Sequence, residues 1–223
     1  MKLTIFAATG GIGRLILEQA LAAGHEVTAV ARHPEGLPAQ ARLVAVDLAA
    51  PDTPALEAAV RGADAVISGL GPRPLAAARA GITSKGTQAI IRAMRAVGAR
   101  RLVVVSAAPV GTVPSPGNPH PPKHDPSEGF FTRHLLGPLV KAIMRTHYAD
   151  LALMEDHLRE SDLDWTSVRP PRLTNGRLTG TYRTAIGRNV PGGGSLSRAD
   201  TAQLMLAVLA RPETIGQTVA GGY

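Results

Sequence analysis

Residues Ala7–Arg14 read Ala-Ala-Thr-Gly-Gly-Ile-Gly-Arg, and this stretch decides the fold. The apolar run Lys2–Ala7 before it has the composition of a buried strand, and Ile12–Ala23 after it has the apolar spacing of a helix. Glycines in such a turn let the backbone approach a pyrophosphate, which then meets the N–H groups and partial positive charge at the helix start. The stretch therefore predicts the strand, turn and helix of a dinucleotide-binding domain.

The glycines fill two of the three places in a Gly-x-x-Gly-x-x-Gly spacing. Gly10 and Gly13 take the second and third places, whereas Ala7 takes the first, although alanine adopts a positive φ less readily than glycine. Without a strand before it and a helix after it, the same stretch would be an ordinary tight turn. The turn residues expected to contact the cofactor are Ala7, Thr9, Gly10, Gly11, Ile12, Gly13 and Arg14.

Apolar runs alternate with helical patterns along most of the 223 residues. Short buried strands joined by helices are typical of the α/β class, here a Rossmann-type doubly wound parallel sheet with helices on both faces. No linker divides the chain, so we expect a single domain over residues 1–223. Further strands are expected at Glu26–Ala31, Arg42–Val46, Ala65–Ser68, Arg101–Ser106 and Asp164–Val168, and further helices at Thr83–Val97, within Gly137–Glu160 and at Arg198–Leu209.

The stretch Ala108–Pro126 interrupts this pattern with seven prolines, two glycines and two histidines in 19 residues. Such a composition predicts no regular element. A loop of this length in a compact domain commonly serves as a lid, and we expect residues 108–136 to cover the active site. His120 and His124 lie within it, but they have no acids or cysteines at the spacing of metal ligands, so no metal site is expected.

The overall composition disfavours several classes of function. The formal net charge is +7, but the basic residues are scattered and only 3% of residues are aromatic, which favours a phosphate-bearing small ligand over nucleic acid. No apolar stretch approaches the ~18 residues of a membrane span, and there is no cysteine for disulfides, thiolate metal sites or nucleophilic catalysis. We expect a cytoplasmic protein, monomeric or homodimeric, without a nucleic-acid or membrane partner.

The end of the second strand indicates which nicotinamide cofactor is bound. Proteins that select NAD usually carry an acid there to hold the ribose hydroxyls, but this strand ends in Ala31-Arg32-His33. Arg32 could bind a 2′-phosphate through its planar fork, so NADP(H) is the expected cofactor; the alternative is an arginine that merely ends a strand at the surface. Asp47 and Leu48, after the third strand, are expected near the adenine, although Asp47 could equally be a solvated loop acid.

Four stretches and one short motif make the sequence resemble a known family. They are Phe6–Gly13, Asp64–Gly71, Leu102–Ala107, Leu158–Tyr182 and the motif Leu196-Ser197-Arg198-Ala199-Asp200. The chain resembles the atypical short-chain dehydrogenase/reductases with an NmrA-like NAD(P)H-binding domain, and its pattern is most similar to the flavin reductase and biliverdin-IXβ reductase group. The resemblance covers nearly the whole chain except the proline-rich loop.

The resemblance implies roles for residues at the carboxyl ends of later strands. Gly69, Leu70 and Gly71 would pass along the cofactor, and Ser106 would lie beside the nicotinamide as a cofactor-binding and catalytic residue. Alternatively, the Ser106 hydroxyl is satisfied by nearby backbone. In the Arg-Pro-Pro-Arg stretch after the sixth strand, Pro170 would contact the cofactor, while Arg169, Pro171 and Arg172 would border the substrate. Arg169 could instead be a structural arginine that ties the strand end to the lid helix.

The chain departs from the Tyr-x-x-x-Lys pair of the wider superfamily. Tyr148 is the candidate proton donor, but alanine stands at the fourth place after it, at Ala152, where lysine would lower the pKa of the tyrosine. A tyrosine packed in the core is the alternative. The expected function is therefore NADPH-dependent hydride transfer to a planar conjugated acceptor such as a flavin or quinone, which can take its proton from solvent. A non-catalytic NADP(H)-binding redox sensor is the alternative, and epimerase chemistry would need the missing pair.

Overall fold

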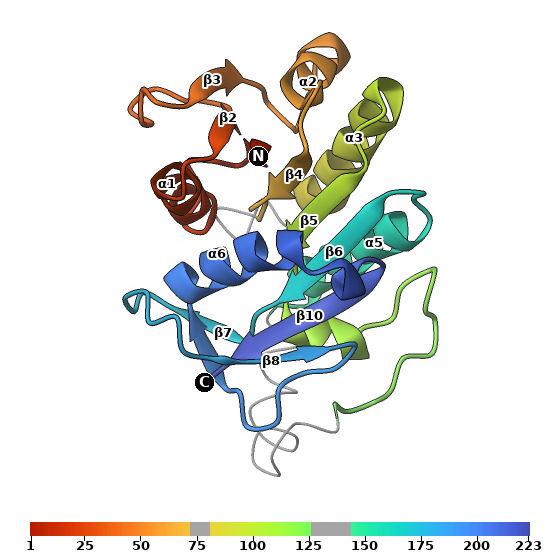
Figure 1. The fold of residues 1–223 in the computed structure, drawn as a ribbon. Helices are drawn as coiled ribbons and strands as arrows, with labels where there is room; N and C mark the ends of the chain where they lie inside the picture. The colour runs from red at the N-terminus through yellow and green to blue at the C-terminus, as the bar shows by residue number, and fades with distance from the viewer. Residues whose placement is uncertain (72–80, 126–143) are drawn as a thin grey trace.

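The computed structural model describes residues 1–71, 81–125 and 144–223. Within these ranges an eight-stranded sheet crosses the molecule in the order β3-β2-β1-β4-β5-β6-β10-β8 (Figure 1). Neighbouring strands are parallel except for β8, which runs antiparallel to β10. The strands are β1 (Lys2–Phe6), β2 (Glu26–Ala31), β3 (Arg42–Ala45), β4 (Ala65–Ser68), β5 (Arg101–Val105), β6 (Asp164–Arg169), β8 (Arg183–Ile186) and β10 (Gln217–Gly222).

The order of the strands fixes where a ligand can bind. From β1 the chain winds outward through β2 and β3 on one side, and then returns to lay β4, β5 and β6 on the other. Phe6, the last residue of β1, pairs with Val30 of β2 and Ser68 of β4. The connections that leave β1 and β4 diverge at this reversal of winding and open a crevice beyond the carboxyl ends of the strands.

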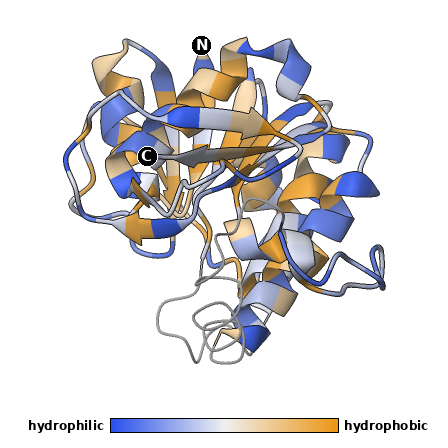
Figure 2. Cartoon of the chain, turned by 90° about the horizontal axis from the view of Figure 1, so that it is seen from below, coloured by the Kyte–Doolittle hydropathy of each residue, from blue (hydrophilic) through white to orange (hydrophobic). Residues whose placement is uncertain are grey.

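Helices cover both faces of the sheet, which confirms the predicted doubly wound Rossmann-type fold. Neighbouring residues of β1 alternate between the faces: Ile5 packs in one hydrophobic cluster with α1 and α6, and Phe6 packs in the other with α2, α3 and α5. Figure 2 shows the hydrophobic stretches gathered on the central strands and polar residues on the outer parts of the helices. The helices are α1 (Gly13–Ala22), α2 (Thr53–Val60), α3 (Ile82–Val97), α5 (Arg145–Arg159) and α6 (Arg198–Ala207). None of the helices within the described ranges is long and apolar enough to cross a membrane.

The second half of the chain contains elements beyond those expected. A separate two-stranded parallel sheet is formed by β7 (Arg172–Thr174) and β9 (Ser195–Ser197). The helix expected to end at Leu209 ends at Ala207 and continues as the 3₁₀ turn η4 (Val208–Ala210), and another 3₁₀ turn, η5 (Pro212–Thr214), precedes β10. Of the helix expected within Gly137–Glu160, α5 is described, while residues 137–143 lie outside the described ranges.

The prediction that the proline-rich stretch has no regular element is wrong for its first part. Ala108–Thr112 forms the 3₁₀ helix η2, because a proline in a first turn removes no helical hydrogen bond and the Thr112 hydroxyl donates to the carbonyl of Pro109 at 2.9 Å. Val110 is buried and packs on the α5 side of the sheet. Residues 126–136 of the expected lid lie outside the described ranges.

Candidate functional site

The turn after β1 places Ala7 in a left-handed conformation. Its φ is 57°, and among the described residues it is the one non-glycine residue with a positive φ. The Gly10 N–H donates to the Ala7 carbonyl at 2.7 Å and closes the turn. The conformation that the first glycine of the spacing normally provides is therefore kept here, with an alanine bearing the strain.

Gly13 lies where three backbone segments meet. A Cβ at Gly13 would stand 2.1 Å from the carbonyl oxygen of Ala7, and a Cβ at Gly69 would stand 3.0 Å from both Cα and N of Gly13. The Gly69 N–H also donates to the carbonyl of Phe6 at 3.2 Å. The start of α1 thus packs directly on the ends of β1 and β4, and the two glycines permit that approach.

A cleft of about 320 Å³ opens beyond the carboxyl ends of β1 to β4. It unites residues from four connections and includes eight of those predicted to contact the cofactor. Seven further lining residues were not predicted, among them His33, Ala49 and Ile82. A narrow backbone cradle beside a mixed apolar and polar cleft suits the adenosine and pyrophosphate of a dinucleotide. Its lining residues are Phe6, Ala7, Thr9, Gly10, Val30, Ala31, Arg32, His33, Val46, Asp47, Leu48, Ala49, Leu70, Gly71 and Ile82.

The remaining predicted cofactor residues lie around this cleft without lining it. Ile12 is buried beneath the turn, Gly11 is exposed, and Arg14 is exposed on α1, where it pairs with Glu18 at 3.0 Å. Asp47 does line the cleft, and its carboxylate also accepts from the Ala49 N–H at 3.0 Å, as a loop acid would. The structure therefore separates residues that shape the turn from those whose side chains face the cleft.

Ser106 and Pro170 lie farther along the same edge of the sheet. The Ser106 N–H donates to the Val168 carbonyl at 2.7 Å, and the Ala108 N–H donates to the Pro170 carbonyl at 2.9 Å, so the exits from β5 and β6 run side by side. Ser106 is buried, and its hydroxyl has no hydrogen bond of standard geometry within the described residues. It nevertheless lies close enough to Glu155 to help lower the pKa of that carboxyl.

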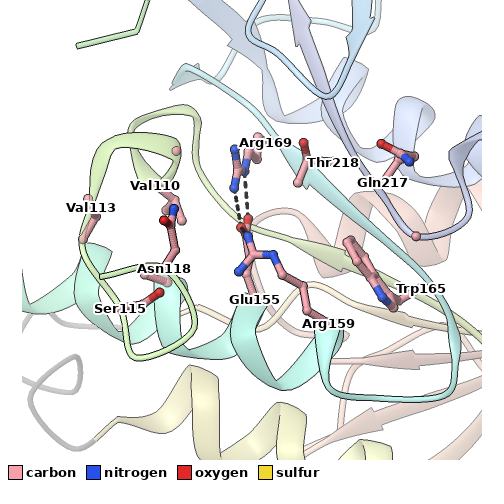
Figure 3. A pocket seen from close by; sticks show the side chains of 13 residues that line it. Val110, Val113, Ser115, Asn118, Glu155, Arg159, Trp165, Arg169, Gln217 and Thr218 are labelled. Atoms are coloured by element: carbon pink, nitrogen blue, oxygen red, sulfur yellow. Dashed lines mark hydrogen bonds and ion pairs between the residues drawn. The ribbon is translucent and has the colours of Figure 1, made fainter. Parts of the chain in front are cut away.

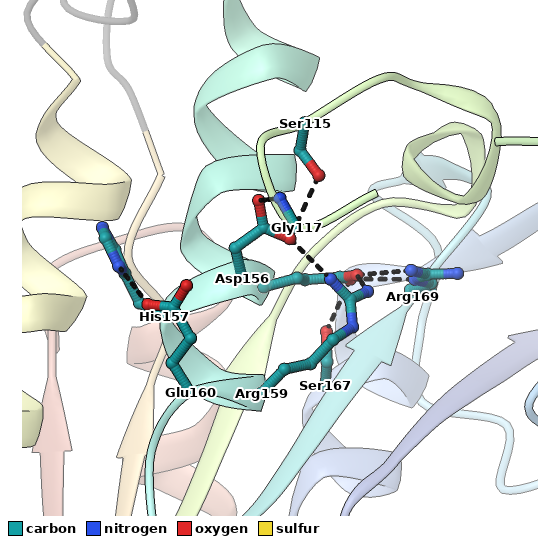
Figure 4. A network of polar contacts seen from close by, with 9 residues as sticks. Ser115, Gly117, Asp156, His157, Arg159, Glu160, Ser167 and Arg169 are labelled. Atoms are coloured by element: carbon teal, nitrogen blue, oxygen red, sulfur yellow. Dashed lines mark hydrogen bonds and ion pairs between the residues drawn. The ribbon is translucent and has the colours of Figure 1, made fainter. Parts of the chain in front are cut away.

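Glu155 of α5 collects donors from three directions and holds Arg169 (Figures 3 and 4). Arg169 makes a two-pronged ion pair with it, in which Nε donates to Oε1 at 2.8 Å and Nη2 pairs with Oε2. Ser167 donates to Oε1 at 3.0 Å, and Arg159 donates to Oε2 at 2.9 Å. Burial acts to raise the pKa of Glu155, but the hydrogen bond and charge of Arg169 outweigh it and the pKa is lowered.

This geometry matches the structural alternative for Arg169. Its guanidinium ties the end of β6 to α5 and lines a second cavity of about 290 Å³, together with Val110, Trp165 and Arg159. This cavity lies over β6 and β10 and shares no lining residue with the cleft beyond β1 to β4. Pro171 is partly buried, and Arg172 is exposed at the start of β7. Of the two predicted substrate arginines, Arg169 has its charge neutralised by an ion pair between described residues, and Arg172 does not.

Asp156, next to Glu155, anchors the proline-rich stretch (Figure 4). It accepts from the Ser115 hydroxyl at 3.0 Å, from the Gly117 N–H at 2.9 Å and from Arg159 at 2.8 Å. A Cβ at Gly117 would stand 2.6 Å from this carboxylate. Adjacent acids on one helix thus hold different partners: Glu155 holds β6, and Asp156 holds the segment after η2.

Tyr148 lies in the hydrophobic core on the α5 side of the sheet. It is 8% exposed, and burial raises its pKa, which makes its hydroxyl a weaker acid. This is the packed-tyrosine alternative, and it gives no support to the predicted catalytic role. Two residues farther along α5, Asp150 accepts from the backbone N–H groups of Thr83 at 2.9 Å and Ser84 at 3.0 Å, and so caps the start of α3.

Asp200 organises the connections around the small sheet. Its fully buried carboxylate accepts from the hydroxyls of Tyr223, Ser197 and Thr179 and from the backbone N–H groups of Thr179 and Gly180. Burial acts to raise its pKa, but the hydrogen bonds from Tyr223, Gly180, Thr179 and Ser197 outweigh it and lower the pKa to about 2. The Ser197-Arg198-Ala199-Asp200 order, typical of a helix start, was the signal that could have located this joint.

Comparison with known proteins places the chain among nucleotide-binding folds. A model of the NAD(P)H-binding family matches residues 7–212. Curated relatives in Mycobacterium bovis and Mycobacterium tuberculosis are uncharacterised; they are 33% identical over 108 residues, which is 48% of this chain and 12% of theirs. The match therefore spans about an eighth of the length of those relatives.

Solved structures share the fold over the whole chain. A provisionally named exported protein of Burkholderia pseudomallei is 28% identical with a TM-score of 0.74, and the alignment covers 100% of both chains. A provisionally named NAD-dependent epimerase/dehydratase of Bacillus halodurans is 25% identical, with a TM-score of 0.75 and 100% and 94% coverage. ChuY of Escherichia coli O157:H7, described as an anaerobilin reductase, is 23% identical, with a TM-score of 0.75 and 99% and 96% coverage, and it shows the fold alone.

Proposed function

Because the chain belongs to the NAD(P)H-binding family, we propose that it is an NADPH-dependent reductase of planar conjugated acceptors such as flavins or quinones. One observation supports the cofactor half of the proposal. The glycine turn after β1 and the basic residues Arg32 and His33 after β2 lie at the same cleft. The acceptor half rests on the packed position of Tyr148 and on the alanine at position 152. We also propose a cytoplasmic protein that acts as a monomer or homodimer.

The preference for NADP(H) is proposed from the charges of the cleft. Arg32 and His33 both line it directly after β2, where NAD-selective proteins carry an acid. Asp47, the one acid among its lining residues, already accepts a backbone hydrogen bond from Ala49. A charge-assisted contact from Arg32 to a 2′-phosphate is worth roughly 1.5–3 kcal/mol, which corresponds to at least about tenfold in affinity.

In the proposed reaction, the chain binds and orients the cofactor and the acceptor and excludes water from them. The cofactor, when bound, would supply the hydride for the acceptor, and solvent would supply the proton that completes the reduction. The exits of β5 and β6, with Ser106 and Pro170, are held side by side by backbone hydrogen bonds and would support the nicotinamide end. Glu155 fixes these exits against α5 through Ser167 and Arg169, so the surface on which an acceptor would stack is rigid.

Two measurements test this function. NADPH and NADH are titrated by calorimetry against the wild type, Arg32→Ala and Gly13→Ala, with Gly194→Ala as control because a Cβ there has nothing within 4 Å. We expect the wild type to prefer NADPH at least tenfold, Arg32→Ala to lose the preference, and Gly13→Ala to bind neither dinucleotide. Equal wild-type affinities would contradict the NADP(H) assignment.

The second measurement is steady consumption of NADPH with added flavin or quinone. Tyr148→Phe should retain more than a tenth of wild-type kcat/KM, because the phenol does not serve as the proton donor. Tight NADPH binding without turnover on any acceptor would instead favour a redox sensor, and a thousandfold loss in Tyr148→Phe would restore acid catalysis by that residue.

A further inference from the structure

The positive charge of the chain is concentrated in one segment. Residues 170–199 contain five arginines and no aspartate or glutamate, within a chain whose whole formal net charge is +7. The segment holds Arg172, Arg177, Arg183, Arg188 and Arg198. Thirty residues thus carry most of the charge excess, although basic residues as such are spread along the sequence.

The fold places four of these arginines toward the carboxyl end of the sheet. Arg172 begins β7, which follows the carboxyl end of β6; it is exposed, while its neighbour Leu173 packs against the core beneath α1 and α6. Arg183 pairs in register with Gly222 at the carboxyl end of β10. Arg198 donates to the Asn175 side chain at 2.6 Å and so brings the start of α6 against the turn that carries Arg177.

Arg188 lies beyond the other end of β8 and can serve as a control for Arg172 and Arg177. The Gly187 N–H donates to the Thr218 carbonyl, near the start of β10, so Arg188 follows a point on the amino side of that strand. It is exposed, like Arg172 and Arg177. Among the five arginines it is therefore the one with similar solvent exposure and a different position relative to the site.

Within the described ranges, acidic side chains do not neutralise this group. None of the ion pairs between described residues includes an arginine of the segment 170–199. Arg183 donates to the backbone carbonyls of Pro191 and Tyr223, which leaves its charge in place. Asp200 follows directly, but its buried carboxylate is occupied by Tyr223, Ser197 and the turn at Thr179 and Gly180. Even with Asp200 counted, five positive charges against one leave a net +4.

We propose that this arginine-only segment selects acceptors that carry a phosphate or carboxylate group, with Arg172 and Arg177 as the side chains that receive it. The inference rests on the proposed function, since it concerns the acceptor of that reaction. An uncompensated cluster of one sign raises the local concentration of oppositely charged ligands, and exposed guanidinium groups bind phosphate and carboxylate through two parallel hydrogen bonds. The planar ring would stack at the strand ends while its anionic substituent lies over β7.

FMN and riboflavin form a matched pair of probes, because they share the same ring system and FMN adds a phosphate. We would measure the binding of each by calorimetry to the protein saturated with NADP+, at low and at high ionic strength, and separately measure kcat/KM with NADPH. FMN should bind at least about tenfold more tightly than riboflavin at low ionic strength, and salt should reduce this ratio severalfold. Arg172→Gln and Arg177→Gln should each weaken FMN about three- to tenfold and leave riboflavin unchanged, and the matched control Arg188→Gln should change neither.

The outcomes separate the two levels of the proposal. Preferential FMN binding without turnover would keep the anion selection and overturn the reductase assignment. Turnover of both flavins with equal affinity and equal kcat/KM would keep the reductase and overturn the anion selection. Binding of neither flavin, or an Arg188→Gln effect as large as that of Arg172→Gln, would overturn the proposed role of these arginines.

Discussion

Single residues of the turn after β1 act through the backbone rather than through their side chains. Gly13 is required because its Cα hydrogens face the Ala7 carbonyl and the Gly69 backbone, and no other residue leaves that space. Ala7 tolerates its left-handed φ of 57° only because the turn around it is closed by Gly10. The tight turn constrains both positions. At position 13 a glycine meets the constraint without strain, whereas at position 7 an alanine meets it at the cost of a left-handed φ.

Replacing Ala7 with glycine should stabilise the protein. The left-handed conformation costs alanine about 1–2 kcal/mol, whereas glycine adopts it freely but loses about 0.5–1 kcal/mol more conformational entropy on folding. The expected net gain is roughly 0.5 kcal/mol in the free energy of unfolding, measured by urea denaturation. Ala8→Gly is the control: Ala8 is fully buried with no positive φ, so its replacement should destabilise. Equal effects of the two changes would contradict the strain at Ala7.

Local sequence could predict these residues because their roles depend on neighbours a few positions away. It identified Ala7 as the departure from the glycine spacing and Arg32 as the residue at the cleft. It could not choose between a substrate contact and a structural tie for Arg169, because Glu155 is 14 positions earlier in the chain and the pairing exists only once α5 packs on β6. The same holds for Tyr148, whose packed position depends on the hydrophobic cluster between α3 and α5.

Among the helices, α3 depends on a residue of another helix for its start. Its own N-cap, Gly81, has a left-handed φ of 64° and no side chain, so the first N–H groups are satisfied by Asp150 of α5. This contact locks two helices together at the carboxyl end of the sheet, beside Ile82, which lines the cleft proposed for the cofactor.

Asp150→Ala should lower the free energy of unfolding by about 2 kcal/mol, because two buried backbone donors lose a charged acceptor. Asp150→Asn keeps one acceptor oxygen and should recover part of the loss. Urea denaturation of both variants measures the effect. Asp162→Asn is the control, because Asp162 is an exposed acid whose ion pair with Arg95 should contribute little to stability. An unchanged free energy of unfolding in Asp150→Ala would mean that the start of α3 does not depend on this cap.

The proline-rich segment is anchored at its beginning, and this limits which part can act as a lid. Residues up to Gly117 are held by η2 and by Asp156, so a nonspecific protease should spare 108–117 in the folded protein. Of the described residues of this segment, the mostly exposed 119–125 should be cut first. Asp156→Asn should extend cleavage into 113–117, whereas Glu160→Gln, an exposed change at the C-cap of the same helix, should not. Cleavage mapped by mass spectrometry within 108–117 of the wild type would contradict the anchor.

The strands of the second half illustrate why some elements escaped sequence analysis. β7 and β9 are three residues long, β8 is an edge strand of four, and β10 ends in two glycines, which weaken any strand pattern. Each is stabilised by pairing with a segment distant in sequence, as when Val219 of β10 pairs with Val168 of β6. The hydrophobic periodicity and strand propensity of a segment carry no information about such distant partners. The apolar runs of β1 and β5, in contrast, can be recognised as strands from their own residues.

At the scale of the whole molecule, buried carboxylates set the resistance to acid. The pKa of Asp200 is about 2 in the folded protein, against an ordinary value of 3.8, so the folded state binds fewer protons than the unfolded state in that range. Its contribution to stability is full above about pH 4 and is lost as the pH falls toward 2. The lowered pKa of Glu155 acts in the same direction.

Asp200→Asn should therefore flatten the acid limb of the stability curve. Between pH 5 and 2.5 the wild type should lose on the order of 1–2 kcal/mol more of its free energy of unfolding than the variant does. Urea denaturation at each pH measures this, and Glu26→Gln, an exposed change on β2, should leave the acid limb as in the wild type. Parallel pH curves for wild type and Asp200→Asn would contradict a role for Asp200 in acid stability.

The order of the last strands has a consequence for biosynthesis. β8 is made before β10 but lies outside it, and β10 is its one neighbour in the main sheet as described. At about 5–20 residues per second, the 30 residues between Ile186 and Gln217 leave the ribosome over about 2–6 seconds, and for that time β8 is a strand without a partner. Arg183 and Arg188 flank its apolar Ala185 and Ile186, as charged gatekeepers flank segments prone to aggregate. Arg183 and Arg188 of the arginine-only segment would then protect the nascent chain while its sheet is incomplete, whereas Arg172 and Arg177 of the same segment receive the ligand.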